Sequence, residues 1–271
     1  RRSAFKALPE AFGLLKFPIH THSFGRQEKN MLVTFEHVTY GYIGVPVVRD
    51  VCFTGHEKER IGFLGGNGEG KTTVLKLLTG ELVPDSGNVV RKNGLSPGYL
   101  EQSGGFTSDS TVYGAMEELF EEDRQLIARL RETEEAMEHA DEAAMKVLSA
   151  RYESLTKRIA ARDSYHYDVR IRTVLNGMGF SAVYAQKVAT MSGGERTKLK
   201  LCRLLLEEPE LLVLDEPTNH LDTTTLFWLE DYLASYKGAL LIVSHDRYFL
   251  DRLTSRTLEL ENGVLTSYKR R

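Results

Sequence analysis

The sequence predicts an α/β fold with a central, mainly parallel sheet, a small antiparallel β-subdomain and a helical arm. The unbroken apolar run Leu211 to Leu214 has the pattern of a parallel strand covered on both faces. A second apolar strand, Arg60 to Leu64, leads into a glycine-rich turn and then a helix. Between Thr111 and Ala161, glycine and proline are scarce and helix-forming residues dominate, which predicts the arm.

Length and composition limit the class of protein. The 271 residues are 41% hydrophobic and 27% charged, enough for a sizeable core in one or two domains. No stretch approaches 18 consecutive apolar residues and no leader resembles a secretory signal, so we expect a cytoplasmic protein without a membrane span of its own. A net charge of −3 gives no global attraction to nucleic acid, so any RNA contact needs a local patch. Cys52 and Cys202 have neither metal-ligand spacing nor the number for a disulfide framework, and we expect both reduced and buried.

The first thirty residues differ from the rest. Prolines and glycines interrupt their short apolar pieces, so residues 1 to 30 are predicted to be an appendage that contributes little to the core. Met31 opens an alternating strand, and the main domain is predicted to run from 31 to 271. Strands are predicted at 31 to 40, 46 to 53 and 60 to 64, with Tyr42 between the first two. Asp85 to Gly87 predicts a turn, and strands at 88 to 91 and 96 to 100 then lead to Gln102.

The glycine-rich turn fits a phosphate-binding motif. Gly65 to Thr72 matches G-x-x-x-x-G-K-[ST], between a predicted strand and the apolar-periodic helix from Val74 to Leu78. The glycines let successive N–H groups curl around phosphate oxygens. Lys71 then neutralises the β/γ charge and the Thr72 hydroxyl ligates Mg²⁺. A chance glycine-rich turn is the alternative, and the flanking strand and helix argue against it.

Two carboxylates follow the apolar strand at 211 to 214. Asp215 and Glu216 emerge at its carboxyl end, where ligands bind in open α/β sheets. Alone they could be a buried structural pair. Beside a phosphate loop, Asp215 becomes the carboxylate that holds Mg²⁺ through water, and Glu216 the base for an attacking water.

The arm is predicted to be a helical hairpin that turns near His139 to Glu142. Its two apolar stripes are Leu119, Leu126, Leu130 and Met137, and Val147, Leu148, Leu155 and Ile159. The acidic run from Glu117 to Glu142 faces a second half that carries Lys146, Arg151, Lys157, Arg158 and Arg162. Pairing of antiparallel helices accounts for most of these charges.

Further elements follow the arm. Asp168 to Phe180 predicts a third helix, and Thr223 to Tyr236 predicts an amphipathic helix. Ala239 to Val243 predicts another buried strand, with His245 at its tip. A histidine at a strand end is often structural, but beside Glu216 it can contact a γ-phosphate and orient the water.

A known family enters with Met191-Ser-Gly-Gly-Glu-Arg196, which resembles the signature motif of ABC ATPases. Physically it is a helix N-terminus with Ser192 as its cap and two glycines that permit close approach of an anion. Gln102, the turn Asn219 to Asp222 and His245 match further motifs of that family in order. The resemblance covers residues 31 to 271 and implies an ABC-type P-loop NTPase fold that uses ATP and Mg²⁺.

The resemblance also implies roles for individual residues. Glu216, His245 and Gln102 would be catalytic, and Thr72, Gln102 and Asp215 would hold the metal. Tyr42 would stack on adenine, with Tyr40 as a core residue or second choice. The full set of nucleotide-binding residues is Tyr42, Gly65, Gly66, Asn67, Gly68, Glu69, Gly70, Lys71, Thr72, Thr73, Ser192, Gly193, Gly194, Glu195 and Asp222.

Gln102 and Ser192 are 90 positions apart, which is longer than the helical subdomain of a transporter's ATP-binding subunit usually is. The arm accounts for the extra length. Together with the turn at 216 to 222, the arm is similar to the ABC-F subfamily, whose members act on ribosomes. That resemblance implies a ribosome-associated translation factor or antibiotic-resistance ATPase. Such proteins normally hold two ABC domains, so we expect pairing with a second one, as a homodimer or with a missing second half. The alternatives are the motor subunit of an ABC membrane transporter and a nucleotide-dependent binding module with little turnover.

Overall fold

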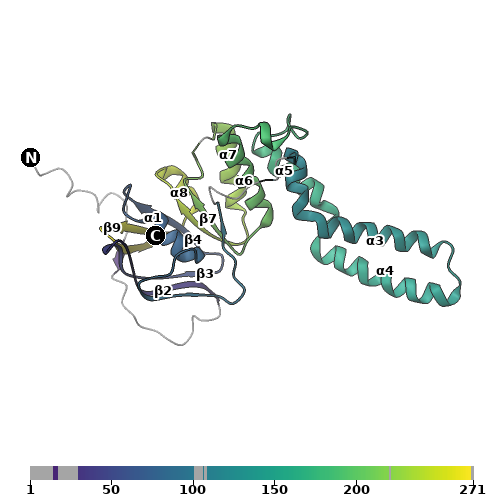
Figure 1. Ribbon diagram of the computed structural model, residues 1–271, viewed down its shortest axis with the longest axis horizontal. Helices are drawn as coiled ribbons and strands as arrows, with labels where there is room; N and C mark the ends of the chain where they lie inside the picture. Colours follow the sequence, from purple (N-terminus) through teal and green to yellow (C-terminus); the bar gives the residue numbers. More distant parts are fainter. Residues whose placement is uncertain (1–14, 18–29, 101–105, 107–108, 220, 270–271) are drawn as a thin grey trace, which may run out of the picture. The chain divides into compact units, whose positions relative to one another are not determined.

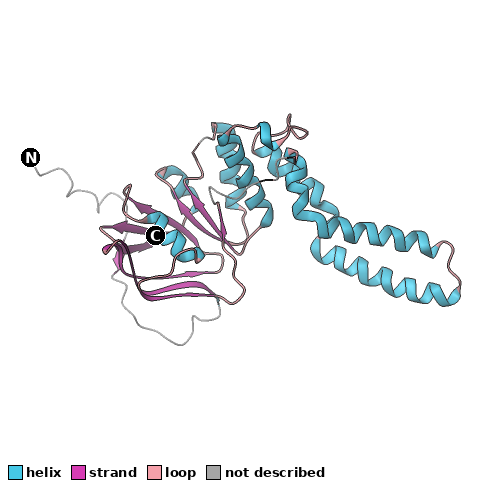
Figure 2. Ribbon diagram, viewed as in Figure 1, coloured by secondary structure: helices cyan, strands magenta, loops and turns pink. Residues whose placement is uncertain are grey.

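The computed structural model describes residues 15–17, 30–100, 106, 109–219 and 221–269. Among these residues, those up to 100 and from 208 onward form one compact unit, and those between 106 and 207 form a second. Figure 1 labels the elements along the chain. Figure 2 shows that the strands belong to the first unit and that the second is built from helices.

The first unit contains a seven-stranded sheet in the order β1-β10-β9-β4-β8-β7-β6. Strands β9, β4, β8, β7 and β6 run parallel, and β10 and β1 add antiparallel pairs at one edge. The bounds are β1 Leu15–Phe17, β4 Arg60–Gly65, β6 Gly98–Tyr99, β7 Leu211–Asp215, β8 Ala239–Val243, β9 Arg256–Glu261 and β10 Val264–Lys269. Three residues of the segment 1 to 30 therefore pair with the sheet, through β1 and β10.

The central strands are buried as the sequence predicts. Every residue from Leu211 to Leu214 and from Ala239 to Val243 is buried. The register aligns Phe63 of β4 with Val243 of β8, and Val243 with Asp215 of β7. The parallel strands therefore end together at one edge of the sheet.

A separate antiparallel sheet has the order β3-β2-β5, with β2 Met31–Tyr42, β3 Val45–His56 and β5 Ser86–Arg91. The sequence prediction for Tyr42 was wrong, because Tyr42 is the last residue of β2 and pairs with Val45. The predicted turn at 85 to 87 was also misplaced, because β5 already begins at Ser86. At Gly87, the second residue of β5, φ is 81° and an added Cβ would lie 2.2 Å from the carbonyl oxygen of His37. Only glycine fits at this position of the strand.

The strand predicted at 96 to 100 is shorter than expected. Only Gly98–Tyr99 forms β6, in parallel with β7. Pro97 precedes it, and proline has no N–H to donate to a ladder.

Two arginines close the C-termini of helices that cover the sheet. The helices of the first unit are α1 Lys71–Thr79, α7 Thr223–Ala234 and α8 Arg247–Leu253. Arg60 donates to the carbonyl oxygens of Leu233, Ala234 and Tyr236 at 2.7, 2.9 and 3.0 Å. Arg91 donates to those of Leu77 and Leu78 at 2.5 and 2.7 Å. The last carbonyl groups of a helix have no hydrogen-bond donor within the helix, and here the two arginine guanidinium groups supply one.

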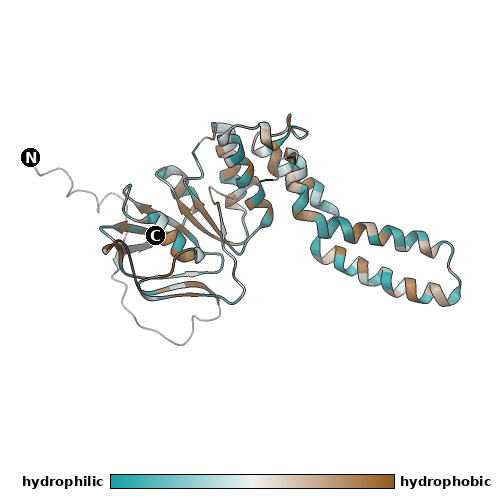
Figure 3. Cartoon of the chain, viewed as in Figure 1, coloured by the Kyte–Doolittle hydropathy of each residue, from teal (hydrophilic) through white to brown (hydrophobic). Residues whose placement is uncertain are grey.

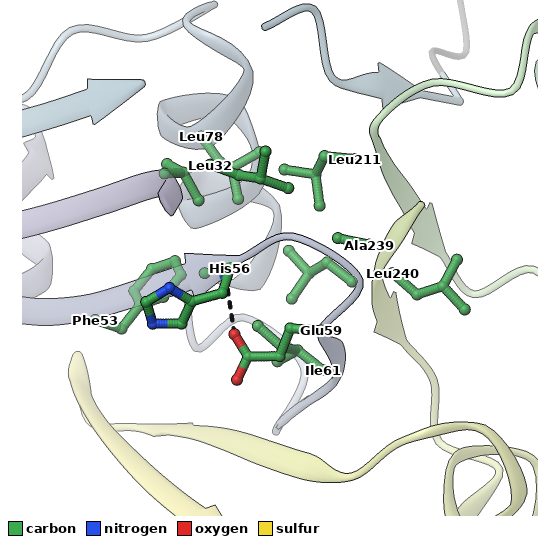
Figure 4. A pocket seen from close by; sticks show the side chains of 12 residues that line it. Leu32, Phe53, His56, Glu59, Ile61, Leu78, Leu211, Ala239 and Leu240 are labelled. Atoms are coloured by element: carbon green, nitrogen blue, oxygen red, sulfur yellow. Dashed lines mark hydrogen bonds between the residues drawn. The ribbon is translucent and has the colours of Figure 1, made fainter. Parts of the chain in front are cut away.

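Both sheets and α1 contribute to one apolar core in the first unit. A cavity of about 10 Å³ lies within it, lined by Leu32 and Phe53 from the antiparallel sheet, Leu78 from α1 and Leu211 from β7. Figure 4 shows these side chains around the cavity. At its rim, the His56 N–H donates to Glu59 Oε2 at 3.0 Å.

The second unit consists of helices. Its members are α2 Val112–Glu117, η2 Glu118–Phe120, α3 Glu121–Met137, α4 Glu142–Arg162, η3 Ser164–His166, α5 Tyr167–Gly177, η4 Val188–Thr190 and α6 Gly193–Glu207. The predicted third helix is α5, which ends three residues early at Gly177. No helix in the described part of the chain combines the length and apolar composition needed to cross a membrane.

The arm is the antiparallel pair α3 and α4, and it begins near Glu121 instead of Thr111. Its core consists of Leu126, Leu130, Leu155 and Ile159, with Ile127 packed against them. The outer part of the predicted stripes was wrong: Val147 is 69% exposed, and Leu148 and Met137 are only half-buried. Figure 3 shows polar and apolar residues interspersed along both helices, so the outer part of the hairpin buries little apolar surface.

Charges join the two helices at the base of the arm. Arg158 and Arg162 lie 3.5 and 3.2 Å from Glu122, and Arg162 also pairs with the buried Asp123 at 3.2 Å. Farther out, the Lys157–Glu153 pair lies within α4. The predicted pairing of antiparallel charges is therefore confirmed at the base.

The cysteines differ in burial. Cys202 on α6 is buried, as predicted, and its burial raises the pKa of the thiol. Cys52 on β3 is only half-buried, which corrects the expectation.

We predict that Asp123→Asn lowers stability by about 1 kcal/mol at neutral pH, because hydrogen bonds to a charged group are lost at a partly exposed partner. Burial by itself raises the pKa of Asp123, but hydrogen bonds from Arg162 and Ser164 lower it below its ordinary value overall. The stabilisation is therefore full above the unfolded-state pKa and is lost as pH falls through the lower, folded-state pKa. Urea unfolding at several pH values measures the difference between the two proteins.

Glu153→Gln is the matched control, since the exposed Lys157–Glu153 pair contributes little. A loss for Asp123→Asn that stays constant down to acid pH would contradict the role of the carboxylate charge.

Candidate functional site

The predicted phosphate loop, the two carboxylates and the histidine meet at one edge of the seven-stranded sheet. β8 lies between β4 and β7, and all three strands run parallel. Gly65 ends β4, Asp215 ends β7, and His245 follows β8 by two residues. Because these strands are parallel neighbours, Gly65, Asp215 and His245 come together at this edge.

The loop between β4 and α1 has the backbone that a phosphate cradle needs. Gly70 precedes α1 with φ at 100°, in the left-handed region that favours glycine. An added Cβ there would lie 2.5 Å from Cγ1 of Val47. Any other residue at this position would have to move β3 or distort the loop.

Two side chains in and next to the loop, those of Lys71 and Glu69, make hydrogen bonds to the backbone. Lys71 Nζ donates to the carbonyl oxygens of Gly65 and Gly66 at 2.7 and 2.9 Å, so its charge lies within the loop. Glu69 Oε2 accepts from the backbone N–H of Asn262 at 2.6 Å, which ties the loop to the turn between β9 and β10. Thr72 is exposed, whereas Thr73 is buried.

Asp215 is a half-buried carboxylate in a site that disfavours its charge. Burial raises its pKa, and the charge of Glu216 raises it further, while Lys71 lowers it in part. Two adjacent carboxylates with a single lysine leave negative charge that a divalent cation would neutralise. Carboxylate and hydroxyl oxygens are ligands that Mg²⁺ prefers, so Asp215 and Thr72 fit such an ion.

Glu216 is held by its backbone while one side-chain oxygen stays unsatisfied. Its φ of 48° lies in the left-handed region, and its N–H donates to the Val243 carbonyl oxygen at 2.8 Å. Oε2 accepts from the backbone N–H of His245 at 3.3 Å. Oε1 is buried and has no hydrogen-bond partner among the described residues, although His245 Nε2 lies 3.4 Å away. A buried carboxylate oxygen without a partner is costly, and a water or ligand group would satisfy it.

The signature segment lies in the second unit, at the start of α6. The Ser192 hydroxyl accepts from the Glu195 N–H at 3.3 Å, and Glu195 Oε2 accepts from the Ser192 N–H at 2.8 Å and from its hydroxyl at 2.7 Å. This reciprocal pair is a capping box, which confirms Ser192 as the helix cap. Gly193 and Gly194 are exposed, and an added Cβ would meet nothing within 4 Å at either.

Other predicted site residues have mixed positions. Tyr42 is 49% exposed and makes an edge contact with Tyr40 at 5.2 Å, so its ring is available for stacking. Asp222 caps α7, because its carboxylate accepts from the Thr225 N–H at 3.0 Å and from its hydroxyl at 2.8 Å. Gln102 lies outside the described residues.

Sequence reasoning missed the supports of the loop. Val47 packs against Gly70, and Asn262 holds Glu69 from 193 positions away. No local pattern marks either residue, because each acts through strand pairing that places distant segments beside the loop.

Comparisons with known proteins identify a matching family model and several relatives of the chain. A family model described as "ABC transporter" matches residues 48–219. The chain is 40% identical to the tylosin resistance ATP-binding protein TlrC of Streptomyces fradiae, over 87% of this chain and 43% of that protein. It is 36% identical to ABC transporter F family member 5 of Arabidopsis thaliana, over 88% of this chain and 35% of that protein. It is also 36% identical to the energy-dependent translational throttle protein EttA of Mycobacterium tuberculosis, over 82% and 39%.

Solved structures agree on the fold. The ATP-binding subunit of an ABC transporter superposes with a TM-score of 0.62 at 20% identity, covering 88% of this chain and 90% of that one. The chain spans less than half the length of the three curated relatives named above.

We predict that Asp215→Asn raises the melting temperature of the nucleotide-free chain at neutral pH. Its folded-state pKa lies above the unfolded value, so the ionised carboxylate opposes folding at neutral pH, and stability rises as pH falls through the folded-state pKa. The same variant should lose most of the stabilisation by Mg·ATP, which for wild type is about 2.7 kcal/mol at a hundred times Kd. Thermal unfolding with and without Mg·ATP measures both effects.

The exposed Glu81→Gln serves as the control and should change neither quantity. A nucleotide-free Asp215→Asn protein that melts below wild type would show that the carboxylate stabilises the fold.

Proposed function

The chain belongs to the ABC transporter family of ATPases, and from this we propose that it binds Mg·ATP and hydrolyses it together with a second ABC domain. The observation that supports hydrolysis best is the buried Oε1 of Glu216, which has no hydrogen-bond partner among the described residues and lies at the edge where β4 leads into the phosphate loop. A carboxylate placed there can accept the proton of an attacking water.

The predicted site residues outside the signature segment would divide the work. The N–H groups of the loop and Lys71 would bind the β- and γ-phosphates, and Thr72 and Asp215 would hold the metal, with Gln102 as a further ligand. Mg²⁺, when bound, would neutralise the charge on the phosphate oxygens. Glu216 would take the proton from water, and His245, 3.4 Å away, would orient that water or contact the γ-phosphate. Tyr42 would stack on the adenine.

A second domain would be needed, because the exposed signature segment would bind ATP that another domain holds. Ser192, Gly193 and Gly194 are exposed at the start of α6, where N–H groups and the positive end of the helix dipole favour an anion. In the family this segment closes over ATP held by the opposite domain. The partner would be another copy of this chain or a second ABC domain in the same protein.

For the biological role we favour a ribosome-associated, cytoplasmic ABC-F protein that acts in translation or antibiotic resistance. Among its relatives are a tylosin resistance protein and a translational throttle protein. The arm, α3 and α4, contains none of the predicted phosphate-binding residues and exposes most of its charges, which suits contact with a partner. The alternative is the motor subunit of a membrane transporter, in which the second unit would contact membrane-spanning chains.

We predict that Glu216→Gln lowers ATP hydrolysis by about 10²–10⁴-fold, because the base is lost while shape and metal binding remain. ATP should then persist between two domains and trap a dimer. Light scattering with and without Mg·ATP measures the trapped species.

Ser192→Arg in the Glu216→Gln background is the matched control, since it should block trapping and leave ATP binding intact. A Glu216→Gln chain that binds ATP but stays monomeric at every workable concentration would contradict self-pairing. A wild type that binds ATP tightly with no phosphate release would instead indicate a binding module.

We predict that shortening the arm abolishes co-sedimentation with ribosomes and spares ATP binding. Replacing residues 131 to 154 by a short Gly-Ser turn keeps the four core residues of the arm and its charged base. A full-length arm with Lys146→Ala is the control for length. If the shortened protein co-sediments as wild type does, the arm has a structural role only. If wild type itself never co-sediments with ribosomes, the result favours the motor subunit of a membrane transporter.

A further inference from the structure

Three side chains with metal-binding atoms meet between β2 and β3, apart from the nucleotide residues. His37 comes from β2, and Asp50 and Cys52 come from β3. One ligand atom from each lies within 4.8 Å of those from the other two. His37 Nδ1 and Asp50 Oδ1 are 2.7 Å apart, and the backbone N–H of His37 donates to Cys52 Sγ at 3.2 Å.

An irregular pairing of the strands produces this meeting. Between Phe35 and Val38 the extra residue is on β2, near His37, and between Val38 and Tyr40 it is on β3, near Asp50. His37 and Asp50 both have positive φ, 51° and 50°, which is uncommon for residues other than glycine. Asp50 and Cys52 are two positions apart on β3, and their ligand atoms lie within 4.8 Å of each other. The two irregular residues bring an imidazole and a carboxylate to the thiol.

A hydrogen-bonded His–Asp pair would account for the contact between His37 and Asp50, but it would not account for the Cys52 thiol beside them. His166 and Asp163 in the second unit form such a pair at 2.6 Å, and among the described residues they belong to no three-ligand group. The His37–Asp50 pair is also exposed, with side chains 68% and 75% accessible, so as an ion pair it contributes little stability.

We propose that His37, Asp50 and Cys52 form a binding site for a divalent transition metal ion of the Zn²⁺ class. Imidazole nitrogen, thiolate sulfur and carboxylate oxygen are the three ligand types that Zn²⁺ takes, and water completes the fourth position. Ligand atoms around tetrahedral zinc lie about 3.3–3.8 Å apart, so the exposed Asp50 carboxylate turns to widen its 2.7 Å contact with His37. On binding, the Cys52 thiol releases its proton to solvent and the thiolate sulfur bonds the metal.

A metal at this position would link β2 to β3 in the sheet that also carries Tyr42. Binding therefore stabilises the antiparallel sheet, since ligands that bind only the folded chain raise its stability.

Co²⁺ titration tests the site, because a cobalt–thiolate bond gives a near-ultraviolet charge-transfer band that a bond to nitrogen or oxygen lacks. The chain should carry His20→Ala and His22→Ala, which remove a possible histidine pair in the N-terminal segment. We expect one equivalent of Co²⁺ to saturate the band, Zn²⁺ to displace it and the melting temperature to rise.

Cys52→Ser should abolish the band. Asp50→Asn and His37→Asn, which suit positive φ, should weaken Co²⁺ binding at least about tenfold. His166→Asn is the matched control and should leave binding unchanged. Absence of the band in a folded chain, or a band that survives Cys52→Ser, would overturn the proposal, as would equal Co²⁺ affinity in the Asp50→Asn and His37→Asn proteins.

Discussion

The site depends on the concentration of charge at the carboxyl ends of three buried parallel strands. Asp215 ends β7, Glu216 follows it, and Lys71 begins α1 after the loop that leaves β4. The parallel register of β4, β8 and β7 brings these residues to the same edge of the sheet. Burial and mutual repulsion raise the pKa of Asp215, and Glu216 keeps a buried oxygen without a hydrogen bond in the described structure. The fold therefore carries a cost that a bound cation and water would offset, as expected for a site organised for a ligand.

Much of the surrounding structure holds this edge in place. Arg60 and Arg91 close α7 and α1, the two helices that follow the carboxylates and the phosphate loop. Gly70 admits Val47 against the loop, and Asn262 fixes Glu69. These contacts preorganise the loop before any nucleotide binds, which lowers the entropy that binding must otherwise overcome. In the second unit, a capping box between Ser192 and Glu195 fixes the start of α6.

The sequence predicted the fold, and it predicted local structure where neighbouring residues decide it. The apolar run before Asp215, the glycine spacing before Lys71 and the capping box at Ser192 each act within a few residues. It failed where distant segments decide. The prediction for the arm's outer stripe was wrong, because Val147 has helical spacing but is 69% exposed. Cys52 accepts a hydrogen bond from the backbone N–H of His37, next to a register shift between β2 and β3. Pairing register and bulges are set by the whole sheet, so spacing alone could not reveal them.

The central claim is that one chain supplies only half of a working ATP site. The most direct measurement is the rate of phosphate release per chain at saturating Mg·ATP over a wide range of chain concentrations. If two domains must pair, the rate per chain rises with concentration and levels off when pairing is complete. A Glu216-dependent rate per chain that is the same at every concentration, with the chain monomeric throughout, would contradict the claim.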